Sequence, residues 1–211
     1  RRASQDNLAF IHPYDDAVVA AGQGTIGLEM MEQRPDLDVV VVPIGGGGLM
    51  AGVATAVHAI NPKVEIIGAQ AKSYAAVKNM IDGENHKIGG STVAEGIAVK
   101  HPGEDNVKII KKLVSRIEIA TETEIEEAIF DFLSAEKLVA EGAAGAGLAV
   151  VKNNLDHFKG KKVGLVVGGQ WGDGVLRVGG KTVDYYRLAA ASVGFQAGVQ
   201  QANYLFIFLT E

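Results

Sequence analysis

One stretch decides the fold of this chain, Val39-Val40-Val41-Val42-Pro43-Ile44-Gly45-Gly46-Gly47-Gly48-Leu49-Met50. It opens with four β-branched residues, which are typical of a strand buried on both faces of a parallel sheet. Four glycines follow, and an apolar helical pattern then runs to Ile60. A strand, a glycine turn and a helix start in this order favour an anion site, because the first N–H groups of a helix point toward that turn. A flexible linker is the alternative, although Ser, Pro or charged flanks would be more typical of one.

The composition excludes several classes of function. The chain has 211 residues, 47% of them hydrophobic and 21% charged, which is ordinary for a globular protein with a sizeable core. Its formal net charge of −5 argues against a nucleic-acid partner. The absence of cysteine excludes disulfides, a thiolate nucleophile and cysteine-ligated metal, and the histidines are too scattered to predict a metal site. With no membrane-length apolar run and no signal-like apolar core, we expect a cytoplasmic protein.

Strands and helices are predicted to alternate on both sides of the central stretch. This alternation of strands and helices predicts an α/β fold in which a parallel sheet is covered by helices. A helix is expected to start at Asp15 or Asp16, and Thr121 with Glu124 fits a capping box for another. The strands are expected at 8–14 (stopping at Pro13), 39–44, 64–68, 116–120 and 162–167. The helices are expected at 16–31, 49–60, 74–83, 104–114, 122–137 and 143–153.

Two nucleotide-binding patterns are present and are both rejected. Gly22-Gln23-Gly24-Thr25-Ile26-Gly27 has the letters of a dinucleotide fingerprint, but helical apolar spacing runs straight through it. Gly180-Lys181-Thr182 resembles the end of a phosphate loop, but Val175 stands where that loop needs a glycine. Gly179-Gly180 instead favours a hairpin turn between two strands.

The pattern changes after residue 167. Short runs of strand-forming residues flank Gly179-Gly180, and another such run covers 204–209. We therefore expect two units, a helix-covered domain over 1–167 and a β-rich antiparallel C-terminal tail over 168–211.

Several runs in the first unit occur together in one known family. Residues 8–167 resemble the C-terminal half of the catalytic domain of threonine/serine dehydratases, which are fold-type II enzymes that use pyridoxal phosphate. The runs that carry the resemblance are Phe10-Ile11-His12-Pro13-Tyr14-Asp15-Asp16, Ala21-Gly22-Gln23-Gly24-Thr25-Ile26-Gly27-Leu28-Glu29, Pro43 to Leu49, Ala94-Glu95-Gly96-Ile97-Ala98-Val99 and Glu141-Gly142-Ala143.

The resemblance implies a cofactor, a site and a reaction. Gly45, Gly46, Gly47, Gly48 and the Leu49 amide would hold the phosphate of pyridoxal phosphate. Glu141 would lie beside the pyridine ring, and Gly96 near the substrate side of the pocket. The implied function is an amino-acid ammonia-lyase acting on threonine or serine, with the cofactor as electron sink. The implied partners are a small amino-acid substrate and further copies of the chain.

Three departures from the family pattern bear on activity. The lysine that forms the family's Schiff base lies upstream in a Ser-Phe-Lys context that this chain lacks, so no catalytic residue is assigned here. The family's Ser-Gly-Gly-Asn reads Val167-Gly168-Gly169-Gln170, and valine offers the pyridine nitrogen no hydrogen bond. Gln70 and Ala76 stand at the acidic positions of a cation site found in some relatives, so no metal is expected. By this resemblance, the chain alone is not expected to be a competent enzyme.

The tail resembles a different family. Residues 166–210, with the runs Gly168-Gly169-Gln170-Trp171-Gly172-Asp173-Gly174-Val175-Leu176-Arg177-Val178, Thr182-Val183-Asp184-Tyr185-Tyr186 and Ala191-Ser192-Val193-Gly194-Phe195-Gln196-Ala197-Gly198, look like part of the lipid-associated SYLF domain. The alternative interpretation is therefore a fragment or chimera whose tail binds lipid or a partner and which catalyses nothing. Strand alternation favours burial of the tail aromatics over a membrane-facing role.

Overall fold

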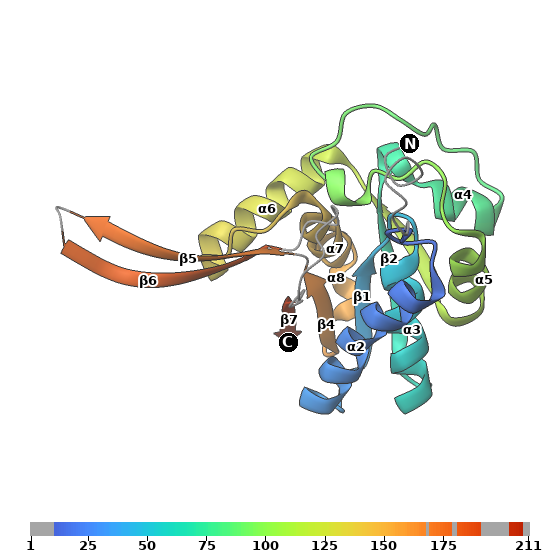
Figure 1. The fold of residues 1–211 in the computed structure, drawn as a ribbon, viewed down its shortest axis with the longest axis horizontal. Helices are drawn as coiled ribbons and strands as arrows, with labels where there is room; N and C mark the ends of the chain where they lie inside the picture. Colours follow the sequence, from blue (N-terminus) through green and yellow to red (C-terminus); the bar gives the residue numbers. More distant parts are fainter. Residues whose placement is uncertain (1–10, 168, 179–180, 191–202, 209–211) are drawn as a thin grey trace.

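The computed structural model describes residues 11–167, 169–178, 181–190 and 203–208 (Figure 1). Its central sheet holds four parallel strands in the order β3-β2-β1-β4, with a further strand, β7, paired antiparallel to β4. The predicted α/β fold with a helix-covered parallel sheet is therefore confirmed. The strands are β1 (Val39–Pro43), β2 (Glu65–Ala71), β3 (Arg116–Ala120), β4 (Lys162–Val167) and β7 (Asn203–Phe208).

Helices cover both faces of this sheet. Val40 and Val42 of β1 belong to the core beneath one group of helices, and Val39 and Val41 to the core beneath the other. All four valines are fully buried, as the two-sided strand prediction requires. The first group is α2 (Ala17–Gln33), α3 (Gly48–Ile60), α4 (Ala76–Asp82) and α5 (Glu104–Leu113), and the second is α6 (Glu122–Glu136), α7 (Gly142–Asn153) and α8 (Leu155–Phe158).

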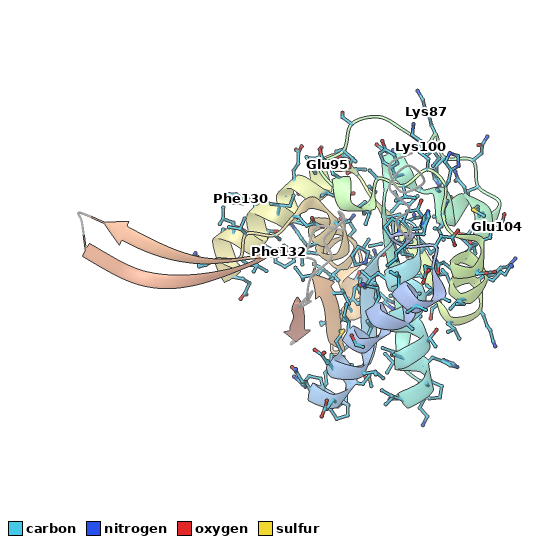
Figure 2. The ribbon with its side chains drawn as sticks, in the orientation of Figure 1. Lys87, Glu95, Lys100, Glu104, Phe130 and Phe132 are labelled. Atoms are coloured by element: carbon cyan, nitrogen blue, oxygen red, sulfur yellow. The ribbon has the colours of Figure 1, made fainter. Side chains whose placement is uncertain are left out.

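The outer faces of the helices are exposed in the usual amphipathic way. On α6, Phe132 is 1% exposed and belongs to the core, whereas Phe130 is 65% exposed on the outside of the helix (Figure 2). In the described ranges, we find no helix with the length and apolar character needed to cross a bilayer.

Side-chain caps fix two helix starts where the sequence predicts them. The Asp16 carboxylate accepts hydrogen bonds from the Val18 and Val19 N–H groups at the start of α2. Thr121 and Glu124 form the predicted capping box at the start of α6. The run Gly22–Gly27 lies wholly inside α2, so it makes no strand-to-helix turn of the dinucleotide-binding kind.

The segment after β2 differs from its prediction. The helix expected over 74–83 is divided into a 3₁₀ turn, η1 (Lys72–Tyr74), and α4, which ends at the left-handed Gly83. The reason is Gln70, whose amide donates to the Tyr74 carbonyl at 3.2 Å and accepts from the Lys78 N–H at 2.9 Å. These backbone groups therefore bond to a side chain instead of continuing one helix. Two short helical turns, η2 (Glu95–Ile97) and α8, lie outside the predicted helices. The strand expected over 8–14 is not formed in its described part, 11–14, where the His12 Nδ1 atom accepts from the Asp15 N–H at 2.9 Å and bends the chain.

The C-terminal segments leave several predictions open. β5 (Gly169–Val178) and β6 (Lys181–Ala190) pair antiparallel and extend away from the helix-covered body (Figure 1). The hairpin turn expected at Gly179-Gly180 lies outside the described residues, as does much of the segment from 191 onward. A β-rich antiparallel tail over all of 168–211, and a domain boundary at 167/168, therefore stay predictions.

Helices α2 and α3 approach each other closely because glycines line their contact. A Cβ on Gly52 would overlap the Ala20 carbonyl oxygen, and one on Gly24 would lie 3.1 Å from the Gly52 oxygen. Both glycines are buried, so the two backbones meet directly.

We predict that Gly52→Ala destabilises the protein by about 1–3 kcal/mol, because the added methyl group forces α2 and α3 apart. Gly22→Ala is the matched control, since an added Cβ there meets nothing within 4 Å on the exposed side of α2. This control is expected to be neutral or to stabilise by up to about 1 kcal/mol through helix propensity. Urea unfolding measures both changes, and an equal effect of the two substitutions would contradict the close contact.

Candidate functional site

The glycine loop (Gly45–Gly48) lies at the carboxyl end of β1 and leads directly into α3. Gly47 is the N-cap of this helix and has φ 95° and ψ −12°, a left-handed backbone conformation that residues other than glycine rarely adopt. The next residue, Gly48, is already helical. A left-handed residue followed by a right-handed one turns successive N–H groups toward one concave spot, which is a known geometry for binding anions.

The N–H groups of this loop are unpaired. Among the described residues, no hydrogen bond is donated by the backbone N–H of Gly45, Gly46, Gly47, Gly48 or Leu49 to another group of the protein. The Ile44 N–H, just before the loop, donates to the Ala69 carbonyl at 2.8 Å. Five consecutive donors at the positive end of a 13-residue helix are thus free to bind a ligand.

Three other segments pack against the loop. The Tyr14 ring occupies the space where a Cβ on Gly46 would stand, and its carbonyl oxygen lies 2.7 Å from the Cβ position of Gly48. A Cβ on Gly45 would lie 3.0 Å from the Cα of Ile97 in η2. One on Gly47 would lie 2.9 Å from the Asn106 Cβ in α5. The lack of side chains therefore lets these segments contact the loop backbone directly.

Glu141 and Gly96 also lie in contact. A Cβ on Gly96 would stand 2.7 Å from the Glu141 Oε1 atom. Glu141 is the N-cap of α7, yet its side chain forms no capping hydrogen bond. Burial raises the pKa of this carboxyl group to about 7. The acid is thus poised to change its protonation state near neutral pH.

The predicted site residues lie close together at the carboxyl ends of the parallel strands. The η2 turn joins them, because Ile97 contacts Gly45 while the adjacent Gly96 contacts Glu141. Figure 2 shows Glu95 of this turn, and Lys100 just after it, at the same end of the molecule. β1 lies between β2 and β4: β2 and β3 follow it on one side of the sheet, and β4 lies on the other. The order of the strands therefore reverses next to β1, which makes this a topological switch point. Ligands of open α/β sheets bind outside the carboxyl ends of the strands at such a point.

Three residues near these strand ends were not assigned to the site from the sequence. Tyr14 belongs to one of the runs that carry the family resemblance, which assigns it no role, and Gln70 is predicted only to stand at a position of the metal site of some relatives. The sequence predicts no role for Asn106. It is 5% exposed in the first turn of α5, four residues before the fully buried Ile110. A polar residue on the apolar face of a predicted helix is the signal that could have marked it.

Tyr14 also lines a polar cavity of about 460 Å³ together with His12, His101 and Asp105. Within the described ranges, no group of three or more His, Asp or Glu side chains is placed to hold a metal ion. The expected absence of metal stays a prediction.

The comparisons with known proteins assign the family. Residues 1–169 match the family described as pyridoxal-phosphate dependent enzyme. The chain belongs to this family. The prediction of pyridoxal phosphate as the cofactor is thereby confirmed for the family, as is the resemblance to threonine/serine dehydratases. Nothing in the comparisons bears on the SYLF resemblance of the tail, which stays a prediction.

Two curated relatives show how much of a family member is present. The L-threonine ammonia-lyase of Thermotoga maritima is 47% identical over 171 residues, covering 80% of this chain and 42% of that protein. The catabolic L-threonine dehydratase TdcB of Staphylococcus aureus is 39% identical over 173 residues, covering 79% of this chain and 50% of that protein. The chain thus spans about half the length of these relatives.

Solved structures share the fold. The processed form of threonine deaminase isoform 2 from Solanum lycopersicum superposes with a TM-score of 0.68 at 31% identity, covering 74% of this chain and 44% of that one. The serine racemase of Dictyostelium discoideum gives a TM-score of 0.68 at 31% identity, covering 77% of this chain and 53% of that one.

The raised pKa of Glu141 predicts a pH dependence of stability. The folded state binds this proton more tightly than the unfolded state, whose pKa is near 4.5. Its contribution to stability is therefore present below pH 4.5 and is lost as the pH rises through about 7. We predict that Glu141→Gln raises the melting temperature relative to the parent at pH 8, with a smaller difference at pH 5. The same difference at both pH values would contradict a buried, titrating Glu141.

Proposed function

We propose that this chain forms the phosphate-binding and ring-facing part of a pyridoxal-phosphate-dependent ammonia-lyase that acts on threonine or serine. The observation that carries the proposal is the row of unpaired N–H groups from Gly45 to Leu49 at the start of α3. Family membership supports it, because the matching relatives are named as threonine ammonia-lyase and threonine dehydratase.

The loop fits the phosphate group of the cofactor. A phosphate dianion needs several donors in a small space, and backbone N–H groups at a helix start supply both the hydrogen bonds and a favourable dipole. A side chain at Gly47 would be strained at φ 95° and would crowd the Asn106 Cβ at 2.9 Å. Glycine is therefore the residue that leaves both the backbone conformation and the neighbouring helix undisturbed.

Two further residues, Glu141 and Gly96, would act on the protonation near the cofactor ring and on the space for the substrate. The bound cofactor would supply the electron sink for the α-carbon of the amino acid. Glu141, which is partly buried and lacks a capping bond, would lie beside the ring and exchange a proton near neutral pH. Gly96 would leave room on the substrate side, because a larger residue there meets Glu141 Oε1.

The substrate and the activity belong to this proposal too. In this sequence no lysine stands in the Ser-Phe-Lys context of the family's Schiff-base residue. We therefore expect the chain alone to bind the cofactor through its phosphate and to catalyse no elimination of ammonia from threonine or serine.

The test is a titration of the chain with pyridoxal phosphate and, separately, with pyridoxal, followed by equilibrium dialysis. We expect pyridoxal phosphate to bind at least about tenfold more tightly, because charged hydrogen bonds to the phosphate contribute about 1.5–3 kcal/mol. Equal affinities would refute the phosphate site. Borohydride reduction with peptide mapping is the second readout, and a specifically reduced lysine would overturn the expectation that this chain lacks the nucleophile.

A matched pair of glycine variants locates the site. We predict that Gly47→Ala weakens binding of pyridoxal phosphate about tenfold or more. Gly83→Ala is the control, since Gly83 is also left-handed at φ 71° but has nothing within 4 Å of its Cβ position. Both substitutions strain the backbone, so both lower the melting temperature, while only the first is expected to weaken binding.

Lipid binding by the tail and assembly into a homo-oligomer remain additional proposals. They rest on the SYLF resemblance and on the incomplete family domain, respectively. Co-sedimentation with liposomes tests the first, and size-exclusion chromatography with light scattering tests the second. A clean monomer that stays in the supernatant at every lipid composition would refute both.

A further inference from the structure

Two buried amide side chains bond to the backbone of the glycine loop and its flanks. Over residues 11–167, the polar or charged side chains found buried are those of Gln70, which is 0% exposed, and Asn106, which is 5% exposed. They come from different elements, β2 and α5. We refer to them together as the amide pair.

Asn106 holds the carbonyl of Gly46. Its Nδ2 donates to the Tyr14 oxygen at 2.7 Å and to the Gly46 oxygen at 3.3 Å. The Gly103 N–H donates to the same Gly46 oxygen at 3.0 Å. Two donors thus fix this carbonyl on the side of α5 and Tyr14.

Gln70 holds the carbonyl of Ile44. Its Nε2 donates to the Ile44 oxygen at 3.2 Å and to the Tyr74 oxygen at 3.2 Å, while its Oε1 accepts from the Lys78 N–H. Both Nε2 hydrogens and the Oε1 atom are thereby used, so Gln70 is a fully satisfied buried amide.

The planar trans peptide links these bonds to the unpaired N–H groups. In such a peptide, the carbonyl of one residue and the N–H of the next point in opposite directions. Holding the Ile44 and Gly46 oxygens therefore directs the Gly45 and Gly47 N–H groups to the opposite side. We propose that Gln70 and Asn106 are positioning residues that orient these two N–H groups toward the bound phosphate, an inference that rests on the function proposed above.

A glycine loop needs such support. Glycine has no Cβ to restrict its backbone, so a peptide between glycines can reverse its orientation at low cost. A reversed Gly46–Gly47 peptide would present a carbonyl oxygen, and hence like charge, to the phosphate. Reversal would also leave one hydrogen of the buried Asn106 amide and the Gly103 N–H unpaired, and that penalty keeps the binding orientation populated.

Isosteric variants test the amide pair without removing bulk. Asn106→Asp and Gln70→Glu replace each donating amide by a carboxylate that cannot donate to the held carbonyl. Asn79→Asp is the control, because Asn79 Nδ2 makes a comparable bond to the His86 carbonyl at 2.9 Å in the loop after α4. All variants are measured as the full chain.

The first readout is ¹⁵N relaxation dispersion of the loop glycines without ligand. We expect millisecond exchange to arise at Gly47 in Asn106→Asp and at Gly45 in Gln70→Glu, with neither in Asn79→Asp. A merely structural loss would affect both glycines equally. Unchanged relaxation at both glycines, or equal exchange at both, would overturn the proposal.

The second readout is the affinity for inorganic phosphate, followed through the Gly45 and Gly47 amide shifts. We expect about tenfold weaker binding in Asn106→Asp and Gln70→Glu and unchanged binding in Asn79→Asp. Parent-like affinity in the first two variants would overturn the proposal. If the parent itself binds neither phosphate nor pyridoxal phosphate, the proposed function fails, and so does the inference that these N–H groups serve a phosphate.

Circular dichroism establishes whether each variant folds. If Asn106→Asp does not fold, Asn106→Ser replaces it, since serine removes the amide without burying a charge. The same expectation holds for it: exchange at Gly47 and weaker phosphate binding.

Discussion

The unpaired donors of the glycine loop depend on a strand that is buried on both faces. β1 has no exposed side, so its end is held in place by helices from above and below. The backbone leaving that strand must turn at once into α3, and Gly47 makes this turn in a left-handed conformation. The start of α3 then lies at the carboxyl ends of the strands, where Ile97 contacts Gly45 and Gly96 contacts Glu141. Sheet order, helix start and glycine content thus act together to place several unpaired N–H donors at the carboxyl ends of the strands.

The parts of the fold that depend on local sequence were predictable. The β-branched run Val39–Val42 predicted the central strand, and Asp16 and Thr121 predicted two helix starts, because the interactions involved span four residues or fewer. The glycine loop and Glu141 were found through the family resemblance, and the structure adds that η2 brings Glu141 and the loop together. Their roles toward the cofactor remain proposals.

The parts that escaped prediction depend on contacts between distant residues. Asn106 bonds to Tyr14 across 92 positions, and Gln70 bonds to Ile44 across 26. Neither contact produces a periodic pattern in the sequence. Gln70 also divides the segment after β2 into two helical pieces, although the apolar spacing of that segment predicts one continuous helix. Side chains that satisfy backbone groups elsewhere in the chain override local propensity, and such side chains gather around this site.

The covering of Gly46 by Tyr14 has a consequence for where a functional unit begins. Tyr14 lies just before α2, and it belongs to no regular element. Its ring nonetheless fills the space beside Gly46, its hydroxyl donates to the His101 oxygen at 3.0 Å, and its own carbonyl accepts from Asn106. A truncation placed at the start of α2 would retain the described helices and the strands of the central sheet but remove the Tyr14 contacts with the glycine loop. For engineers who shorten or transplant this domain, residues 11–16, just ahead of α2, therefore belong with the glycines.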